Sequence, residues 1–284
     1  MKAALYPNFQ KRNALKCARE TCDVLNTAGI EVCVSDKFRN DFADKAFVHF
    51  EDIRQSAKTA DFVIAIGGDG TILRCSKLLI GTDTKLLGIN TGTLGFMAGL
   101  EADQLDRLEL LKTGDYEISD RMTLDVVFTE NGKKVTYTAL NEVSARSGSF
   151  RICDFEVYSD GYLVGKYRAD GVLFSTPSGS TAYALSAGGP VIEPDLECIE
   201  MTQICPHSLF SRATLFSSCR KLCLTSSTRR EEYMVISVDG ELHIKLKTDE
   251  SIEICRGKHN IRFINLIGNS FHESLCRKLC KPIK

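Results

Sequence analysis

Strand-like and helix-like segments alternate along residues 2–112, and this alternation constrains the fold more than any other feature of the sequence. It is typical of a parallel sheet covered by helices. Residues 61–66 form an almost continuous apolar run, as in a strand buried on both faces. The expected strands cover 2–5, 30–34, 61–66 and 85–89, and the expected helices cover 11–28, 51–58, 71–79 and 102–112. Gly29 is expected to end the first helix. This part is predicted to be a Rossmann-like α/β domain.

From about Tyr116 the pattern changes to alternating apolar and polar residues, which is typical of antiparallel strands. Hairpin turns are expected at three dipeptides of the type that favours them, Asn131-Gly132, Asp160-Gly161 and Asp239-Gly240. One helix is expected near Ser180–Ala187 and another at Phe271–Leu279. Residues 197–227 stay unassigned, because Cys198–Ile204 fits a strand or a helix. The second part is therefore predicted to be β-rich.

The balance of charges narrows the class of partner. Lys and Arg number 36 and Asp and Glu number 37, so the net charge of −1 creates no basic field for a polyanion, and no nucleic-acid partner is expected. No apolar stretch approaches the roughly 18 residues of a membrane-spanning helix. The amino terminus runs into a strand-like segment without the apolar core of a signal peptide. We expect a cytoplasmic protein with small-molecule partners and no membrane partner.

Twelve cysteines occur in the 284 residues, and without a secretory signal we expect them to be reduced thiols. The pentapeptide Cys-Arg-Lys-Leu-Cys occurs twice, at 219–223 and 276–280. Cysteines four apart share a face of a helix, so a structural zinc site is one interpretation. The alternative is a basic amphipathic turn used twice, and we predict no protein-held metal site.

A glycine turn follows the most apolar strand. Gly67–Thr71 reads Gly-Gly-Asp-Gly-Thr and opens a helix, which places it at the carboxyl end of a parallel strand, where open α/β sheets bind ligands. Glycines and free amides suit a phosphate there, Thr71 can cap the helix and Arg74 can add a contact. Asp69 then fits a proton acceptor or a magnesium ligand, or it only caps the helix. No P-loop sequence is present.

Four further segments carry candidate site residues. Asn90–Phe96 follows the next strand, so its glycines are expected to face the first turn. Asn141-Glu142, followed by Arg146 and Arg151, and Tyr167–Gly171 combine amide, carboxylate and guanidinium groups that suit a base edge, a ribose diol and phosphates. Ser175–Pro190 packs hydroxyls and glycines between a strand and a helix, where Ser180 or Thr181 can cap the helix and Tyr183 offers an aromatic face.

In this order and spacing the motifs Gly-Gly-Asp-Gly-Thr, Asn-Thr-Gly-Thr-Leu-Gly-Phe, Asn-Glu, Tyr-Arg-Ala-Asp-Gly and Thr-Pro-Ser-Gly-Ser-Thr-Ala-Tyr resemble those of the NAD kinase family. The resemblance covers residues 61–241. Diacylglycerol kinases, sphingoid lipid kinases and 6-phosphofructokinases carry similar glycine turns, and the hydroxyl-rich segment distinguishes the NAD kinases from them.

The resemblance implies two domains. An α/β domain of residues 1–98 and 258–284 would carry the Gly-Gly-Asp-Gly-Thr turn, and residues 99–257 would form a β-rich NAD-binding domain. The family forms homodimers or homotetramers. The implied activity is that of a phosphotransferase, in which the 2′-hydroxyl of the adenosine ribose of NAD attacks the terminal phosphoryl group of ATP or polyphosphate to give NADP. A divalent cation, normally Mg²⁺, would neutralise the donor phosphates.

The resemblance also implies roles for individual residues. Asp69 would be the general base, with Gly70 and Arg74 beside the phosphates. The dinucleotide would be held by Asn141, Glu142, Arg151, Arg168 and Asp170, and its base by Thr181, Ala182, Tyr183 and Ser186. Two positions depart from the usual pattern, since Ser178 stands where many members have threonine and Glu241 where glutamine is frequent.

Two other classes of function stay open at this stage. A lipid kinase would share the glycine turn but needs an apolar acyl pocket, and a silent sensor would bind the dinucleotide without needing Asp69 as a base.

Overall fold

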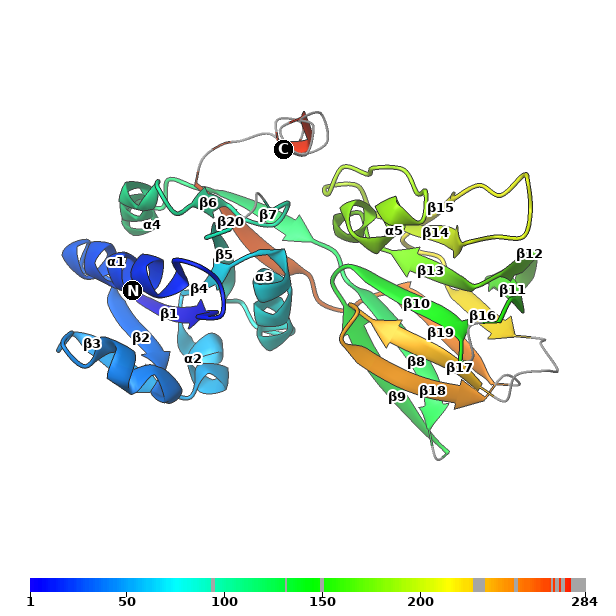
Figure 1. Ribbon diagram of the computed structural model, residues 1–284, viewed down its shortest axis with the longest axis horizontal. Coiled ribbons are helices and arrows are strands. Elements are labelled where there is room, and N and C mark those ends of the chain that lie inside the picture. The colour runs from blue at the N-terminus through cyan, green and yellow to red at the C-terminus, as the bar shows by residue number, and fades with distance from the viewer. Residues whose placement is uncertain are drawn as a thin grey trace. The chain divides into compact units, whose positions relative to one another are not determined.

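The chain folds into two compact units (Figure 1). The computed structural model describes residues 1–92, 95–130, 132–148, 151–226, 233–247, 250–266, 268, 271 and 274–276. The first unit comprises Met1–Asp120 with Ile261–Lys284, and the second comprises Arg121–Asn260. The α/β and β-rich classes are those predicted.

The first unit is built on a mostly parallel sheet. Its strands are Lys2–Pro7 (β1), Glu31–Ser35 (β2), Val48–Glu51 (β3), Phe62–Gly67 (β4), Lys85–Asn90 (β5), Leu100–Glu101 (β6), Glu117–Arg121 (β7) and Ile261–Asn265 (β20). They lie in the order β3-β2-β1-β4-β5-β20-β7, and β6 pairs with β5. The four predicted strands are confirmed. The short edge strand β3 was not predicted.

Helices cover the sheet of this unit on both sides (Figure 1). They are Ala14–Thr27 (α1), Ile53–Thr59 (α2), Asp69–Ser76 (α3) and Leu110–Thr113 (α4), with 3₁₀ helices at Asp36–Phe42 (η1), Lys77–Leu79 (η2) and Leu105–Glu109 (η3). Gly29 has a φ of 71°, so it ends the first helix as predicted. The helix expected over 102–112 is instead the pair η3 and α4, which ends at Gly114 with a φ of 79°.

The segment after β5 belongs to the first unit because its leucines complete that unit's core. Leu100, Leu105, Leu108 and Leu111 are buried in the same apolar cluster as Leu25 of α1. The predicted boundary at residue 98 therefore differs from the observed division after Asp120. Burial of these leucines removes their apolar surface from water. A domain boundary at residue 98 would place the leucines in a different unit from the residues they pack against.

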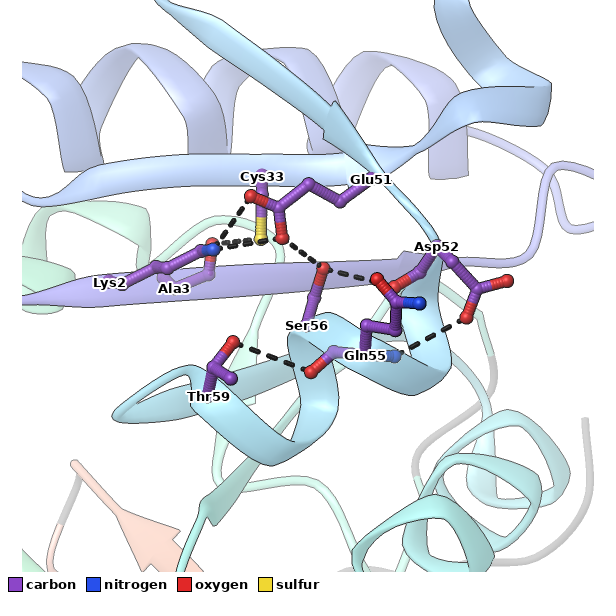
Figure 2. Close-up of polar contacts among 8 residues, drawn as sticks. All are labelled: Lys2, Ala3, Cys33, Glu51, Asp52, Gln55, Ser56 and Thr59. Carbon is purple, nitrogen blue, oxygen red and sulfur yellow. Dashed lines mark hydrogen bonds and ion pairs between the residues drawn. The ribbon is translucent and has the colours of Figure 1, made fainter.

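A polar network joins the edge of the first sheet to α2 (Figure 2). Lys2 Nζ on β1 lies 2.8 Å from both carboxylate oxygens of Glu51 on β3. The buried hydroxyl of Ser56 donates to Glu51 Oε2 at 2.8 Å. Asp52 caps α2 by accepting from the amides of Arg54 and Gln55. Glu51 thus links three elements that are separate in sequence.

Glu51→Gln is expected to lower the free energy of unfolding by about 0.5–1 kcal/mol near neutral pH. The hydrogen bond from Lys2, followed by that from Ser56, lowers the pKa of Glu51. A carboxyl group with a lowered pKa in the folded state stabilises above its unfolded pKa, and this contribution disappears as the pH falls through the folded value. Denaturant unfolding of both proteins across the acid range measures this. A difference that does not shrink in acid contradicts the prediction.

The second unit contains two antiparallel sheets. Its strands are Leu124–Glu130 (β8), Lys133–Ala139 (β9), Glu142–Ser147 (β10), Cys153–Ser159 (β11), Tyr162–Ala169 (β12), Gly171–Ser175 (β13), Cys198–Ile204 (β14), Thr214–Ser217 (β15), Leu222–Ser226 (β16), Tyr233–Val238 (β17), Leu242–Lys247 (β18) and Ser251–Arg256 (β19). One sheet has the order β15-β14-β13-β10-β17-β18 and the other β12-β11-β16-β19-β8-β9. Their apolar residues form one core, which includes Phe155, Phe174 and Ile254.

Two of the three predicted hairpin turns in this unit are confirmed. Asp160 and Gly161 have φ of 49° and 85°, and Asp239 and Gly240 have φ of 50° and 67°, as a two-residue type I′ hairpin requires. Asn131 lies outside the described residues. The unassigned segment 198–204 is strand β14.

The helix predicted near 180–187 is formed by a 3₁₀ turn at Ser178–Thr181 (η4) and the short helix Tyr183–Ser186 (α5). The predicted helix Phe271–Leu279 lies largely outside the described residues. Among the helices that the structure describes, none combines the length and apolar character that a membrane crossing requires.

Candidate functional site

Three neighbouring strands of the first unit end at one edge of its sheet. Strand β4 pairs in parallel with β1 and with β5, and the register sets Gly67 opposite Asn90. The amide of Thr91 donates to Gly67 O at 3.1 Å, and that of Asn8, after β1, donates to Ile66 O at 3.0 Å. The two glycine turns therefore lie side by side, as predicted.

Asp69 joins these two turns. It is the first residue of α3, and its Oδ2 accepts from the amide of Phe96 at 2.7 Å while Oδ1 accepts from that of Met97 at 3.2 Å. The residue before α3 is Gly68, and no side chain caps the helix. The interpretation of Asp69 as only a helix cap is therefore wrong. The carboxylate is half-buried and held in one orientation by the second turn.

Gly95→Ala is expected to lower catalytic activity without unfolding the protein. A Cβ on Gly95 would overlap the Asp69 carboxylate, so the side chain that bonds Phe96 and Met97 would have to move. A displacement of about 1 Å costs on the order of a hundredfold in rate. Steady-state kinetics alongside thermal unfolding checks this, with Gly92→Ala as the control, because a Cβ there meets open space. Equal kinetics for the two variants would contradict the prediction.

Thr71 was predicted to cap α3, but its hydroxyl does not do so. Thr71 lies inside the helix, where its buried Oγ1 accepts from Asn8 Nδ2 at 3.1 Å. Asn8 was missed by the sequence reasoning, although it directly follows the first predicted strand and thus reaches the same edge. Gly70 and Arg74 both lie on α3 and are exposed, Gly70 directly after Asp69.

In the second unit, Asp239 organises the Asn-Glu motif. This buried side chain accepts from three consecutive amides, those of Leu140 at 3.1 Å, Asn141 at 2.8 Å and Glu142 at 3.2 Å. From the sequence, Asp239 was predicted only as a turn residue. The same dipeptide at Asp160 is exposed and pairs with Arg220, so the dipeptide alone carries no signal for this role.

The hydroxyl-rich segment packs directly on that motif. Thr176 donates from its amide to Asn141 O at 2.9 Å and from its hydroxyl to Leu140 O at 2.6 Å. A Cβ on Gly179 would overlap the carbonyl of Asn141, so glycine is required for this close approach. Among the described residues, the buried Asn141 Oδ1 has no hydrogen-bond donor. An unsatisfied buried acceptor between these two packed segments is a position where a ligand donor fits.

A cavity of about 310 Å³ lies over β10, β17 and β18. Four predicted site residues line it, Glu142, Arg151, Asp170 and Tyr183. Arg146, which the sequence also offered as a candidate guanidinium, lines it as well. The other lining residues had no role predicted from the sequence, and they are Ser144, Ser147, Gly148, Val235, Ser237, Gly240 and His243. Glu142, Ser144 and Arg146 alternate along β10, and Ser237 stands opposite Ser144 on one side and His243 on the other. In a strand every second side chain lies on the same face, so the spacing of Glu142, Ser144 and Arg146 was the sequence signal that could have identified this lining face.

The remaining predicted residues do not line this cavity. Arg168 lies on β12 in the other sheet, where its guanidinium pairs with Asp154 at 2.9 Å. Thr181 is the last residue of η4, Ala182 lies between η4 and α5, and Ser186 is the last residue of α5. Neither predicted hydroxyl caps α5, because its first position is preceded by Ala182 and no side chain bonds there. The Ser180 hydroxyl instead donates to Pro177 O at 2.7 Å and accepts from the amide of Ile192 at 3.0 Å.

Ser178, the position that departs from the usual threonine, contacts a largely enclosed arginine. Arg121 Nη1 lies 3.4 Å from Ser178 Oγ. Burial lowers the pKa of Arg121, and the charge of Asp195 opposes this. Glu241, the other departure, is exposed directly after the Asp239-Gly240 turn.

The cysteine pentapeptides form no metal site in the part of the chain that the structure describes. Cys219 is exposed in a turn and Cys223 lies in β16, so the first pair shares no helix face. Cys280 lies outside the described residues. No group of three or more His, Cys, Asp or Glu side chains gathers among those that are described.

The chain combines an α/β unit that carries paired glycine turns with an antiparallel unit whose cavity presents carboxylate, guanidinium and hydroxyl groups, an arrangement suited to a nucleotide-binding enzyme. Residues 4–116 match the model of the ATP-NAD kinase N-terminal domain, and residues 140–266 match that of the ATP-NAD kinase C-terminal domain. The chain belongs to the NAD kinase family.

Similar proteins agree with this assignment. The NAD kinase of Citrifermentans bemidjiense is 31% identical over 281 residues, which is 98% of both chains. That of Lachnoclostridium phytofermentans is 36% identical over 237 residues, 81% of this chain and 83% of the relative. An Archaeoglobus fulgidus NAD kinase in complex with ATP superimposes with a TM-score of 0.72 at 25% identity over 93% of each chain. Yeast NADH kinase complexed with NADH shares the fold, with a TM-score of 0.90 at 20% identity over all of this chain and 89% of that one.

Proposed function

We propose that the chain phosphorylates NAD on the 2′-hydroxyl of its adenosine ribose, with ATP or polyphosphate as the donor, to give NADP. The observation that carries the proposal is the Asp69 carboxylate, held by two amides between adjacent glycine turns at the carboxyl edge of the parallel sheet. Family membership supports NAD as the acceptor, and the ATP complex of the similar Archaeoglobus fulgidus enzyme supports a nucleoside triphosphate donor.

Asp69 acts as the general base in this proposal. A ribose hydroxyl is a weak nucleophile, so a proton acceptor within hydrogen-bond reach is required. The 2′-oxygen forms a bond to the terminal phosphorus while the bond from that phosphorus to the bridging oxygen breaks. The electron pair leaves with ADP or the shortened polyphosphate, and the proton passes to Asp69. Gly70 and Arg74 lie on the same helix and bind the donor phosphates, supported by the helix amino terminus.

The second unit binds the dinucleotide in this proposal. Asn141 and Glu142 hold the adenosine end, where the buried Asn141 Oδ1 offers an acceptor. Arg151 and Asp170 line the cavity and hold the rest of the molecule, together with Arg168. Tyr183 offers its ring to a base, and Thr181, Ala182 and Ser186 complete that pocket. Guanidinium groups suit phosphate oxygens, and a carboxylate suits a ribose diol.

A divalent cation, Mg²⁺ in most such reactions, would be bound mainly by the donor phosphates. The absence of a cluster of three acidic, His or Cys side chains among the described residues fits a cation that arrives with the nucleotide, with Asp69 as the nearby carboxylate. Such a cation neutralises charge on the transferred group. The homodimer or homotetramer stays a prediction from the family resemblance, and the cytoplasmic location stays a prediction from the sequence.

A coupled assay tests the function directly. Purified protein is given Mg²⁺, NAD and either ATP or polyphosphate, and NADP is read with an NADP-specific dehydrogenase. Diacylglycerol replaces NAD in a parallel reaction with labelled ATP. We expect NADP with at least one donor and no labelled lipid. Folded protein that binds NAD yet makes no NADP with either donor would favour the sensor, and labelled lipid without NADP would favour the lipid kinase.

A further inference from the structure

A carboxylate is buried beneath the hydroxyl-rich segment. Glu200 lies on β14 with none of its surface exposed. Its Oε2 accepts from the hydroxyl of Ser175 at 2.8 Å, and its Oε1 accepts from that of Thr202 at 2.7 Å. Among the described residues it forms no ion pair, so two neutral hydroxyls are the groups that satisfy it. Burial raises the pKa of Glu200, and the two hydroxyl bonds oppose this.

Glu200 touches the hydroxyl-rich segment at both ends. Ser175 is the first residue of that segment and the last residue of β13. At the other end, a Cβ on Gly189 would overlap Glu200 Oε1, so the backbone there lies directly against the carboxylate. The amide of Gly189 donates to Ala184 O at 2.9 Å and closes α5. The loop that contains Tyr183 is thus bracketed by two contacts with one side chain.

The same contacts lead to the cavity. Across the sheet, Ser175 stands opposite Glu200 on one side and opposite Glu142 on the other. Side chains of directly opposite residues share a face, so Glu142, Ser175 and Glu200 form one row over three strands. Glu142 and Tyr183 line the cavity, whereas Ser175 and Glu200 do not. Glu200 therefore lies outside the cavity, in the same row as the lining residue Glu142, and contacts the two ends of the loop that contains Tyr183.

Burying a carboxylate without a cation is costly, and an apolar side chain of similar size would pack there at lower cost. Apolar packing has no directional preference, however, whereas a carboxylate with two hydroxyl donors fixes both of its neighbours in position. This residue therefore contributes to the geometry of the loop more than to stability.

We propose that Glu200 is a positioning residue for dinucleotide binding, which holds Ser175 and Gly189 so that the loop between them presents Tyr183 to the cavity. The proposal rests on the proposed function, because it assigns NAD to this cavity. It concerns the acceptor only, since the donor is assigned to Gly70 and Arg74 of the first unit.

Two matched variants separate positioning from simple destabilisation. Ser175→Ala removes the hydroxyl donor at the start of the loop that contains Tyr183. Thr202→Val removes the hydroxyl donor on Glu200's own strand and keeps the shape of the side chain. Each leaves the carboxylate with one hydroxyl. We expect Ser175→Ala to raise KM for NAD and the calorimetric Kd for NAD about tenfold, with KM for ATP unchanged. Thr202→Val is expected to change both NAD parameters less than threefold, at a similar Tm.

Substitutions of Glu200 itself complete the test. Glu200→Met keeps the volume and should reproduce the tenfold loss in NAD affinity, whereas Glu200→Gln keeps one acceptor and should recover most of it. Equal NAD affinities for Ser175→Ala and Thr202→Val would overturn the proposal, as would a parallel rise in KM for ATP. These comparisons need an active wild type, so a wild-type protein that makes no NADP would count against the proposed function instead.

Discussion

Asp69→Asn is expected to lower kcat for NADP formation by about 10²–10⁴-fold, the range for loss of a general base. Asparagine cannot accept the 2′-hydroxyl proton, while the cavity residues assigned to NAD lie in the other unit and are untouched. NAD binding measured by calorimetry should therefore stay within about threefold of wild type. The coupled assay gives kcat.

Asp61→Asn is a suitable control for that experiment. Asp61 lies immediately before β4, at the opposite end of the strand that leads to Asp69, and it also accepts a backbone amide, that of Lys2 at 2.8 Å. Its substitution should leave kcat unchanged. A magnesium titration separates the two roles that the sequence left open for Asp69. If added Mg²⁺ restores the rate of Asp69→Asn, the carboxylate is a metal ligand and the assignment as a base is wrong.

Asp239→Ala is expected to lower the free energy of unfolding by about 3 kcal/mol or more. Three buried amides, from Leu140 to Glu142, lose their acceptor, and an unsatisfied buried donor costs about 1–3 kcal/mol. Because these amides belong to the motif that Asp239 holds in place, KM for NAD should rise as well. Urea unfolding and steady-state kinetics measure the two effects.

Asp160→Ala controls for the backbone in that experiment. Asp160 and Asp239 each precede glycine in a hairpin turn and have φ of 49° and 50°, so alanine suffers the same conformational strain at both positions. Asp160 accepts one amide, that of Lys221 at 3.1 Å, and is exposed. Its variant should lose much less stability than Asp239→Ala, because exposed polar contacts contribute little. If the two variants are equally destabilised, the strain of the turn and not the three amides accounts for the loss.

Arg168 and Asp170 show that two residues of one motif can belong to different sheets. They are two residues apart in one motif, and the resemblance assigned both to the dinucleotide. The chain passes from one sheet to the other at this point, since β12 ends at Ala169 and β13 begins at Gly171. Asp170 consequently lines the cavity, whereas Arg168 faces Asp154 across β11 and β12. Which sheet a strand joins depends on distant partners and cannot be read from the motif.

Local signals were sufficient for much of this protein. The alternation of apolar segments, the glycine turns after strands and the Asp-Gly dipeptides determined the two fold classes, the edge of the first sheet and the hairpins, because each depends on residues close in sequence. The ordered motifs identified the family for the same reason, since each motif is a short turn with its own backbone requirements.

Only the tertiary structure decided which residues support those motifs. Asp239 reaches the amide of Asn141 from 98 positions away, and Glu200 reaches Ser175 across 25. Asn8 meets Thr71 from 63 positions away. A buried carboxylate or amide is stable only where distant segments supply its hydrogen-bond partners, and the packing of the sheets sets that convergence, which no local pattern encodes.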